Sequence, residues 1–463
     1  MKGLWSTLGL VAVAAGLGAY IYFVEAERPE GEVKEKVFAV AADDVEELRV
    51  TAKGETTVLR KTDGKWLLVE PVATDADQNE VTALLGGLTS LEINREVDAK
   101  AASLAEYGLS SPKSDITFTA KGGTTGRVRL GDQTPTGGDV YAVRGDDSRV
   151  FLVATFAETS LARSPFELRD KRVLRFERDQ ADGVELTVGD RVPVVFSRSN
   201  SAWRVTAPVN ARGDYGAIEG LLTRLSTTMM TAIETTDLSD LKQYGLATPA
   251  SSIVVRTGSS SATLAIGTSA EGKAYARDLA RPMVFTIDPA FATELLKEAG
   301  EYRRKELFEF RAFSVTTLAI TRGADTVTFK KTAGSGETPA DKWTITQQGA
   351  TRDADAAKMD DFLAKLSNLR ADVFVAAAPA RAAMPVVKVT AEFDENKKED
   401  GSIGRDGADS YGTRPDEAGA MKLTTSAVDE ALKALDDVLA PPAPPASPAA
   451  AAPPAAGAPA EKK

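Results

Sequence analysis

Three aspartates occupy matching positions in the sequence and are the best-placed groups for acid–base chemistry. Asp77, Asp214 and Asp355 each stand just before a stretch with apolar residues at helical spacing. Paired carboxylates can transfer protons or bind a cation. Aspartate is equally a preferred N-cap residue, and Glu80, three residues after Asp77, completes a capping-box pattern. Because the aspartate recurs three times, we expect helix caps and assign no catalytic residue.

Tryptophans and basic residues recur in the same way. An exposed aromatic ring can bind sugars, but a tryptophan inside an apolar strand usually belongs to the core, which is what we expect for Trp66, Trp203 and Trp343. Clustered cations can bind phosphate or an acidic partner. These clusters lie where one repeat gives way to the next, so we expect salt bridges between repeats from Arg163, Arg169, Lys171, Arg172, Arg175, Arg303, Arg304 and Lys305.

The residues that the chain lacks exclude several classes of enzyme. There is no cysteine and no histidine, which rules out thiolate catalysis, Cys/His zinc sites, haem ligation by these residues and Ser-His-Asp triads. The net charge of −11 argues against nucleic acid as the main partner. Any catalysis would need carboxylates, Lys, Tyr, Ser or a metal bound by oxygen ligands. We find no such site in the sequence, so we expect no cofactor, no metal and no enzymatic activity, and we identify no small-molecule substrate.

Three polar, glycine-containing stretches resemble ligand loops only superficially. Residues 131–139, "GDQTPTGGD", lack the Gly-Lys-Ser/Thr ending of a phosphate-binding loop, so a hairpin loop is expected. Residues 331–342 are a polar loop of the same kind. Residues 394–412 are acidic and Gly-rich but lack the ligand spacing of a calcium loop, and we expect a flexible loop there.

The elements that must position these residues form an internal repeat. Pro71 and Pro208 follow Trp66 and Trp203 at the same distance, and an apolar helix comes next. The same spacing then leads to two near copies, "LAEYGLSSP" and "LKQYGLATP", that contain Tyr107 and Tyr244. A third, degenerate copy repeats the pattern after Trp343, with "AAPARAAMP" in place of the Tyr-Gly-Leu element. Glycine there suits a chain reversal at positive φ, so Tyr-Gly-Leu is interpreted as a corner of the fold.

Within a copy, short alternating strands separated by turn signals such as "TDG" surround one longer amphipathic helix. Strands and helices do not alternate strictly, which favours an α+β fold with mostly antiparallel sheets and packed helices. We predict a transmembrane signal anchor with a short flank at residues 1–30 and repeat units at 31–172, 173–308 and 309–440. The Pro/Ala-rich residues 441–463 are expected to be a disordered tail.

The N-terminal segment predicts a membrane location. Residues 3–24 carry no charge, and 22 helical residues span about 33 Å, enough for a hydrocarbon core of about 30 Å. The bulky "YIYFV" ending favours an uncleaved anchor over a cleaved signal peptide. Lys2 precedes the segment and Glu25 and Glu27 follow it, which places the N-terminus in the cytoplasm and the bulk of the chain outside, at the bacterial inner membrane.

These motifs together resemble one protein family. The Trp–Pro spacing, "L..YGL..P", the strand ends "LGD" and "IGT", and the Arg-x-Lys junctions are similar to the domain of unknown function 4340 family. The resemblance implies a membrane-anchored extracytoplasmic protein, often encoded near ABC transporters of the gliding-motility type, and it supplies no catalytic residues. We expect a non-enzymatic scaffold or interaction protein that is accessory to such a complex. The alternatives are a cell-wall or polysaccharide binding module and, less favoured, a carboxylate-dependent hydrolase.

Overall fold

The computed structural model describes residues 34–267, 273–295, 297–334, 341–394 and 396–441. The anchor expected over residues 3–24 and nearly all of the Pro/Ala-rich segment lie outside these ranges. Within the described ranges, no helix combines the length and the apolar character needed to cross a bilayer. The chain divides into two compact units, the first containing the first sheet and the second containing the second and third sheets.

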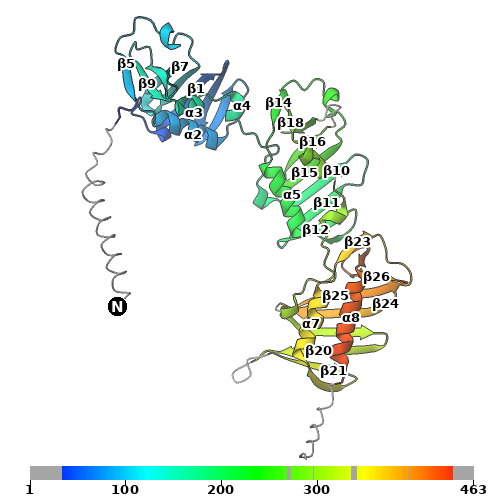
Figure 1. The fold of residues 1–463 in the computed structure, drawn as a ribbon. Coiled ribbons are helices and arrows are strands. Elements are labelled where there is room, and N and C mark those ends of the chain that lie inside the picture. The colour runs from blue at the N-terminus through cyan, green and yellow to red at the C-terminus, as the bar shows by residue number, and fades with distance from the viewer. Residues whose placement is uncertain (1–33, 268–272, 296, 335–340, 395, 442–463) are drawn as a thin grey trace, which may run out of the picture. The chain divides into compact units, whose positions relative to one another are not determined.

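Three nine-stranded antiparallel sheets confirm the predicted repeat of a sheet-rich fold (Figure 1). The first sheet has the strand order β4-β3-β2-β1-β6-β7-β8-β9-β5, and the equivalent strands follow the same order in the other two. The first repeat contains β1 (Val45–Ala52), β2 (Glu55–Thr62), β3 (Lys65–Glu70), β4 (Thr74–Asp75), α2 (Gln78–Thr89), β5 (Arg95–Asp98), β6 (Ser114–Ala120), β7 (Thr125–Gln133), β8 (Asp139–Arg144), β9 (Val150–Ala154), α3 (Phe156–Leu161) and α4 (Pro165–Leu168).

The second repeat contains β10 (Gly183–Val188), β11 (Val194–Ser199), β12 (Ala202–Ala207), β13 (Ala211–Arg212), α5 (Tyr215–Thr227), β14 (Ala232–Thr235), β15 (Ser251–Thr257), β16 (Ser260–Ile266), β17 (Ala274–Asp278), β18 (Val284–Ile287) and α6 (Pro289–Glu294). The third contains β19 (Val315–Arg322), β20 (Asp325–Thr332), β21 (Lys342–Gln347), β22 (Ala350–Ala354), α7 (Ala356–Ser367), β23 (Ala371–Val375), β24 (Pro385–Phe393), β25 (Lys397–Asp406), β26 (Asp409–Thr413), β27 (Ala420–Leu423) and α8 (Thr425–Leu439).

Local sequence explains the first meander of the first sheet. In β1, alternate residues are buried, as the period of a strand with one face on the core requires. The turns after β1 and β2 place Lys53-Gly54 and Asp63-Gly64 at positive φ, the conformation of two-residue hairpins that continue the strand twist. The turn that "TDG" predicts is therefore confirmed.

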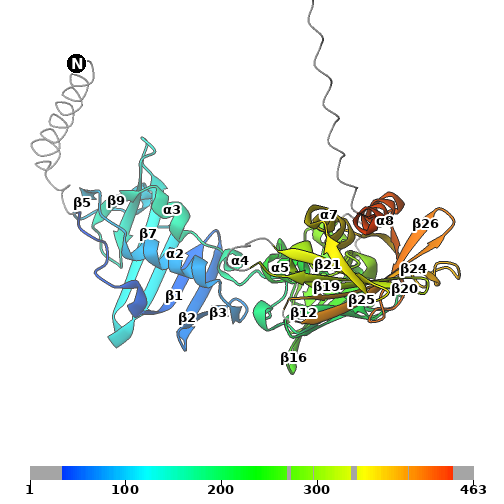
Figure 2. The same ribbon diagram turned by 90° about the horizontal axis from the view of Figure 1, so that it is seen from below.

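The helices cover one face of each sheet and close its core. In the first repeat, α2 buries Val81, Leu84, Leu85 and Leu88, the four residues that the helical spacing singled out. Full burial of each such side chain contributes about 1.5–3 kcal/mol. In the third repeat, α7 and α8 lie side by side on one face of the sheet (Figure 2). The cores therefore lie between one sheet face and its helices.

Residues 394–412 correct a prediction, because most of them form β25 and β26 and not a flexible loop. Their glycines leave room for packed side chains. A Cβ atom on Gly401 would come within 2.6 Å of the Phe308 ring, and one on Gly412 within 2.9 Å of Leu307. The high glycine content therefore reflects close packing of the sheet against apolar side chains. In contrast, residues 134–138 connect β7 to β8, so the hairpin loop expected there is confirmed.

Candidate interaction surface

The three recurring aspartates cap helices, as the sequence predicts. The Asp77 carboxylate accepts hydrogen bonds from the backbone N–H groups of Asn79 and Glu80 at the start of α2. Asp214 accepts one from Ala217, and Asp355 caps α7 in the same way. The side chain of Glu80 lies 3.6 Å from a different partner, the guanidinium group of Arg163. These carboxylates satisfy helix termini, which fits their recurrence.

The three tryptophans belong to the cores. Trp66, Trp203 and Trp343 are 4%, 2% and 3% exposed. The indole N–H of Trp203 donates a 2.8 Å hydrogen bond to Glu219 on α5, which satisfies the polar end of a buried ring. A ring buried in this way offers no platform to a sugar.

The Tyr-Gly-Leu element forms a corner over the second face of the sheet. Gly108 ends a short 3-10 helix with φ of 70°, and Gly245 does so with φ of 65°. The Tyr107 ring packs against that of Tyr141 of β8, with centroids 5.1 Å apart and planes tilted by 57°, beside a small apolar cluster that contains Leu109 and Val143. This cluster covers the sheet on the side opposite to the helices. The element is therefore structural in both copies, as the sequence predicts.

The glycine of the "LGD" and "IGT" motifs is explained by the same corner. A Cβ atom on Gly131 would overlap the carbonyl oxygen of Tyr107, and one on Gly267 would overlap that of Tyr244. In the third repeat, which lacks Tyr-Gly-Leu, a Cβ atom on Gly404 would overlap the carbonyl oxygen of Ala382. The close approach of loop and strand therefore persists where the recognisable motif has disappeared.

The basic residues at the repeat boundaries have separate structural partners. Arg169 is 3% exposed and forms a β-bridge with Ala76. The ammonium group of Lys171 donates a 2.8 Å hydrogen bond to the Glu167 carbonyl oxygen. The guanidinium of Arg172 lies 2.6 Å from the Asp170 carboxylate. The partners in these three contacts all belong to the first repeat.

At the boundary of the second and third repeats, the predicted inter-repeat salt bridges are present. The Glu417 side chain is 3% exposed and pairs with Arg212 of β13 and with Arg303, whose side chains are 7% and 5% exposed. Burial lowers the pKa of Arg303, although the nearby Glu417 carboxylate acts in the opposite direction. The Arg303 guanidinium also stacks on the Phe374 ring, 4.0 Å from its centroid. One carboxylate therefore joins two arginines of the second repeat to the third.

A second buried pair supports this junction from within the third repeat. Glu399 accepts a 2.6 Å bond from Arg414 and further bonds from the backbone N–H groups of Glu309 and Phe310. Burial opposes the charge of Arg414, but its hydrogen bonds to Asp416 and Glu399 together raise its pKa. The surrounding backbone is thereby held in one arrangement.

Sequence reasoning missed an arginine that performs the same task in every repeat. Arg144 donates to the Val37 carbonyl oxygen at 3.3 Å, Arg281 to that of Val173 at 2.9 Å and Arg414 to that of Leu307 at 3.0 Å. Each carbonyl belongs to the segment that leads into its repeat. A signal was available in "YAVR" and "YGTR", where the arginine follows a strand tyrosine at one spacing.

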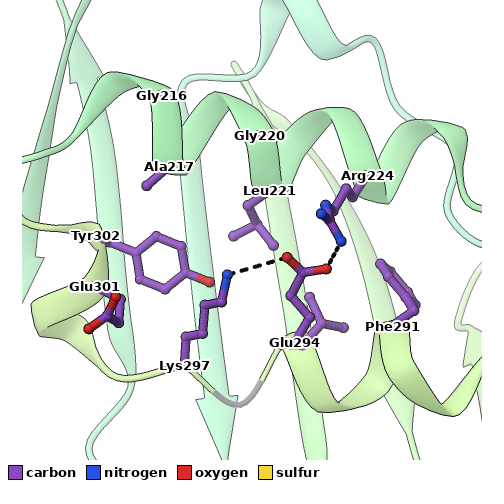
Figure 3. Close-up of a pocket in the computed structure, with 11 residues that line it drawn as sticks. Gly216, Ala217, Gly220, Leu221, Arg224, Phe291, Glu294, Lys297, Glu301 and Tyr302 are labelled. Carbon is purple, nitrogen blue, oxygen red and sulfur yellow. Dashed lines mark hydrogen bonds and ion pairs between the residues drawn. The ribbon is translucent and has the colours of Figure 1, made fainter.

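The second repeat contains a cavity of about 320 Å³ between α5 and the α6 region (Figure 3). Leu221 and Phe291 line it, while Arg224 and Lys297 both reach the carboxylate of Glu294, Lys297 at 3.3 Å. Burial raises the pKa of Tyr302 to about 12, so this phenol stays protonated at neutral pH. Two cations neutralise the Glu294 carboxylate, so the arrangement suits packing or binding.

A second cavity follows the edge of the third sheet. It has a volume of about 410 Å³, and β23 supplies one wall with Val373, Phe374 and Val375. The opposite side comes from the second repeat, with Pro208 and the segment 298–301. Across the residues that the structure describes, no group of three or more acidic side chains is arranged to hold a metal ion. This groove, bordered by two repeats, is a candidate for contact with a partner.

Comparison with known proteins supports a family but no activity. Crystal structures of the DNA polymerase sliding clamp from Pseudomonas aeruginosa align over 84% of this chain and 94% of theirs, with 8% identity and a TM-score of 0.16. The DNA polymerase III subunit beta from Borrelia burgdorferi aligns over 83% and 92%, with 7% identity and a TM-score of 0.15. Scores this low carry no argument about fold or function.

No curated protein matches the chain in sequence. Residues 66–202 and 203–385 match the family described as "Domain of unknown function (DUF4340)". These two matches cover more than half of the chain and correspond to successive copies of the repeat. The chain therefore belongs to the DUF4340 family.

Proposed function

We propose that this protein is a non-enzymatic, membrane-anchored scaffold whose repeats stand outside the cytoplasm and bind a membrane complex, of which an ABC-type transport or gliding-motility assembly is the leading candidate. The proposal rests on the observation that the polar residues that recur in the repeats make structural contacts. Asp77 and its equivalents cap helices, and Glu417 joins two repeats. The nature of the complex rests on the family resemblance alone.

The joined second and third repeats suit a scaffold. Besides the ion pairs at Glu417, the N–H group of Ala418 donates to the Asn210 carbonyl oxygen at 2.8 Å. Arg204 donates to the Asp416 carbonyl oxygen at 2.8 Å. The connecting segment also bonds to both repeats, through Asp214 N–H to Tyr302 and through Ala371 N–H to Lys305. A junction fixed in this way presents a surface of constant shape, which lowers the entropic cost of binding.

A glycan-binding module is less well supported, because buried Trp66, Trp203 and Trp343 cannot stack on a sugar. A carboxylate-dependent hydrolase needs two free acids in one cleft. In the cavity of Figure 3, Glu294 is bound by two cations, which argues against that role.

Affinity capture from gently solubilised membranes tests the proposed partner. We expect the full-length chain to recover the ATP-binding and membrane-spanning subunits of a transporter in constant ratio. Glu47→Gln, which removes one exposed ion pair with Arg60 in the first repeat, serves as a control and should capture equally. Recovery of no transporter subunit from wild-type chain would defeat the transport-complex part of the proposal.

Membrane topology can be tested through the absence of cysteine from the chain. Ser110→Cys introduces a single thiol at an exposed position of the first repeat. We expect a membrane-impermeant maleimide to label this thiol in intact spheroplasts. Labelling only after lysis would place the repeats on the cytoplasmic side and reverse the orientation.

A further inference from the structure

The edge strand of the third sheet lacks the protection found at the equivalent edge of the first. β5 ends the first sheet with Arg95, Glu96 and Asp98 in a four-residue strand, and charges of this kind discourage pairing with another chain. β23 ends the third sheet, pairs with β27 and carries the run Val373-Phe374-Val375. Val373 is 55% exposed. Asp372 is the one charged residue of β23, and Ala371 at its start already donates to the Lys305 carbonyl oxygen. The apolar run that follows is therefore the part of the edge that can act as a template for an additional strand.

The groove beside β23 continues into a second apolar cavity of about 330 Å³. The two share Pro208 and residues 298–300. The second is lined by apolar side chains of the β10–β11 hairpin, among which Val192 is 65% exposed, and by the cations Arg191 and Lys297. Contiguous exposed apolar surface with polar margins is typical of interaction sites. In an extended peptide every second side chain points to the same side, so these side chains would occupy the two cavities.

The charges at the margin indicate the character of the occupant. Asp372 accepts hydrogen bonds from the Thr424 hydroxyl at 2.9 and 3.1 Å. It also lies near Lys422, whose ammonium group forms its ion pair with Asp409. Glu301 lies 3.8 Å from Lys305. Two cations also line the groove, but Arg303 pairs with Glu417 and Lys305 with Glu301. The carboxylates of Glu298 and Asp372, one at each side, therefore complement a peptide with apolar residues and flanking lysine or arginine.

We propose that β23 binds an extended segment of a partner protein as an additional antiparallel or parallel strand, with apolar side chains in the groove and basic residues beside Glu298 and Asp372. Backbone hydrogen bonds to the sheet edge give affinity in this mode, and the side-chain pockets give specificity. The inference deepens the proposed scaffold function, on which it rests, by naming how a partner is held. The chain's own residues 441–463 fit poorly, because proline has no N–H group to donate to a ladder.

A labelled peptide provides the direct test on the full-length protein in detergent. The probe is fluorescein-Lys-Val-Thr-Val-Thr-Val-Lys-amide, followed by fluorescence anisotropy. Val373→Lys places a charge on the β23 edge, and Val97→Lys places one on β5 as the matched control. We expect saturable binding that Val373→Lys weakens at least about tenfold, which corresponds to about 1.4 kcal/mol. Val97→Lys should bind as wild type does, and thermal unfolding should show both variants folded.

Three results would overturn the inference. The first is absence of saturable binding to wild type, and the second is equal binding by both lysine variants. The third comes from single cysteines in this cysteine-free chain: oxidative dimerisation of Val373→Cys but not Val97→Cys would identify a second copy as the occupant. If Val373→Lys still captures transporter subunits, the groove is irrelevant but the scaffold function survives. If wild type captures none, the scaffold proposal fails whatever the peptide does.

Discussion

Replacing Glu417 with glutamine should weaken the junction of the second and third repeats by a predictable amount. The Glu417 carboxylate pairs with Arg212 and Arg303, and all three side chains are less than a tenth exposed. Glutamine keeps the shape and one acceptor oxygen but loses the charge, and its NH₂ group faces a guanidinium donor. The substitution therefore leaves two buried cations with reduced compensation.

The size of the destabilisation in Glu417→Gln depends on the partners that Arg212 and Arg303 retain. Removing one member of a buried ion pair costs about 3–5 kcal/mol. Arg212 retains a bond to the Glu306 carbonyl oxygen at 2.8 Å and lies 3.4 Å from Glu309, and Arg303 retains the Ala418 carbonyl oxygen at 3.2 Å. These remaining partners place the expected loss near the lower limit, about 3 kcal/mol.

Hydrogen exchange resolved by peptide mass spectrometry is the suitable assay, because a chain of several units need not unfold in one step. We expect Glu417→Gln to reduce the protection of β12 in the second repeat and of β21 in the third together. Glu47→Gln removes an exposed pair with Arg60, 2.9 Å apart, and should cost less than about 1 kcal/mol. A change below about 0.5 kcal/mol in Glu417→Gln would refute the role of the buried pair, since exposed substitutions already vary by that much. Loss of protection in one repeat alone would refute the coupling.

Other predictions concern single residues. Partial burial opposes ionisation of Glu167, but hydrogen bonds from Ser164 and Lys53 outweigh it and lower the pKa to about 2. Since this pKa lies below the ordinary 4.5, the stabilisation is present above about pH 4.5 and is lost as pH falls toward 2. In Glu167→Gln, the free energy of unfolding measured by denaturant titration should therefore decrease less over this pH range. Gly131→Ala should destabilise the first repeat by about 1–3 kcal/mol or more, because its Cβ atom would overlap a backbone oxygen; a melting temperature equal to that of wild type would contradict the corner. In contrast, Gly220 on α5 has no atom within 4 Å of its Cβ position, so Gly220→Ala should stabilise the helix by up to about 1 kcal/mol. A lower free energy of unfolding in urea would show that the cavity of Figure 3 is closed at this position.

Much of the local structure was predictable from the sequence. Apolar spacing identified the four buried residues of α2, and the position of Asp77 identified its cap. The "TDG" turn and the positive φ of Gly108 followed from residue type. These features depend on contacts within a few residues, so the sequence alone contains the physical information that they need.

Residues 394–412 show where local reasoning failed. Glycine and acidic residues suggested a flexible loop, yet β25 and β26 lie within the third sheet. Whether a glycine marks flexibility or close packing depends on what lies opposite, and Phe308 faces Gly401 across a long stretch of sequence. The pairing of Glu399 with Arg414 is likewise a result of strand register.

The sequence by itself determined the repeat, its helices and turns, its family, and the exclusion of cysteine and histidine chemistry. Only the tertiary structure decided that Glu417 joins Arg212 to Arg303, and that β23 lies at a sheet edge beside a groove. The physical reason is that helix periodicity and capping act between near neighbours. Burial of a charge and exposure of an edge depend on how strands distant in sequence are ordered and packed.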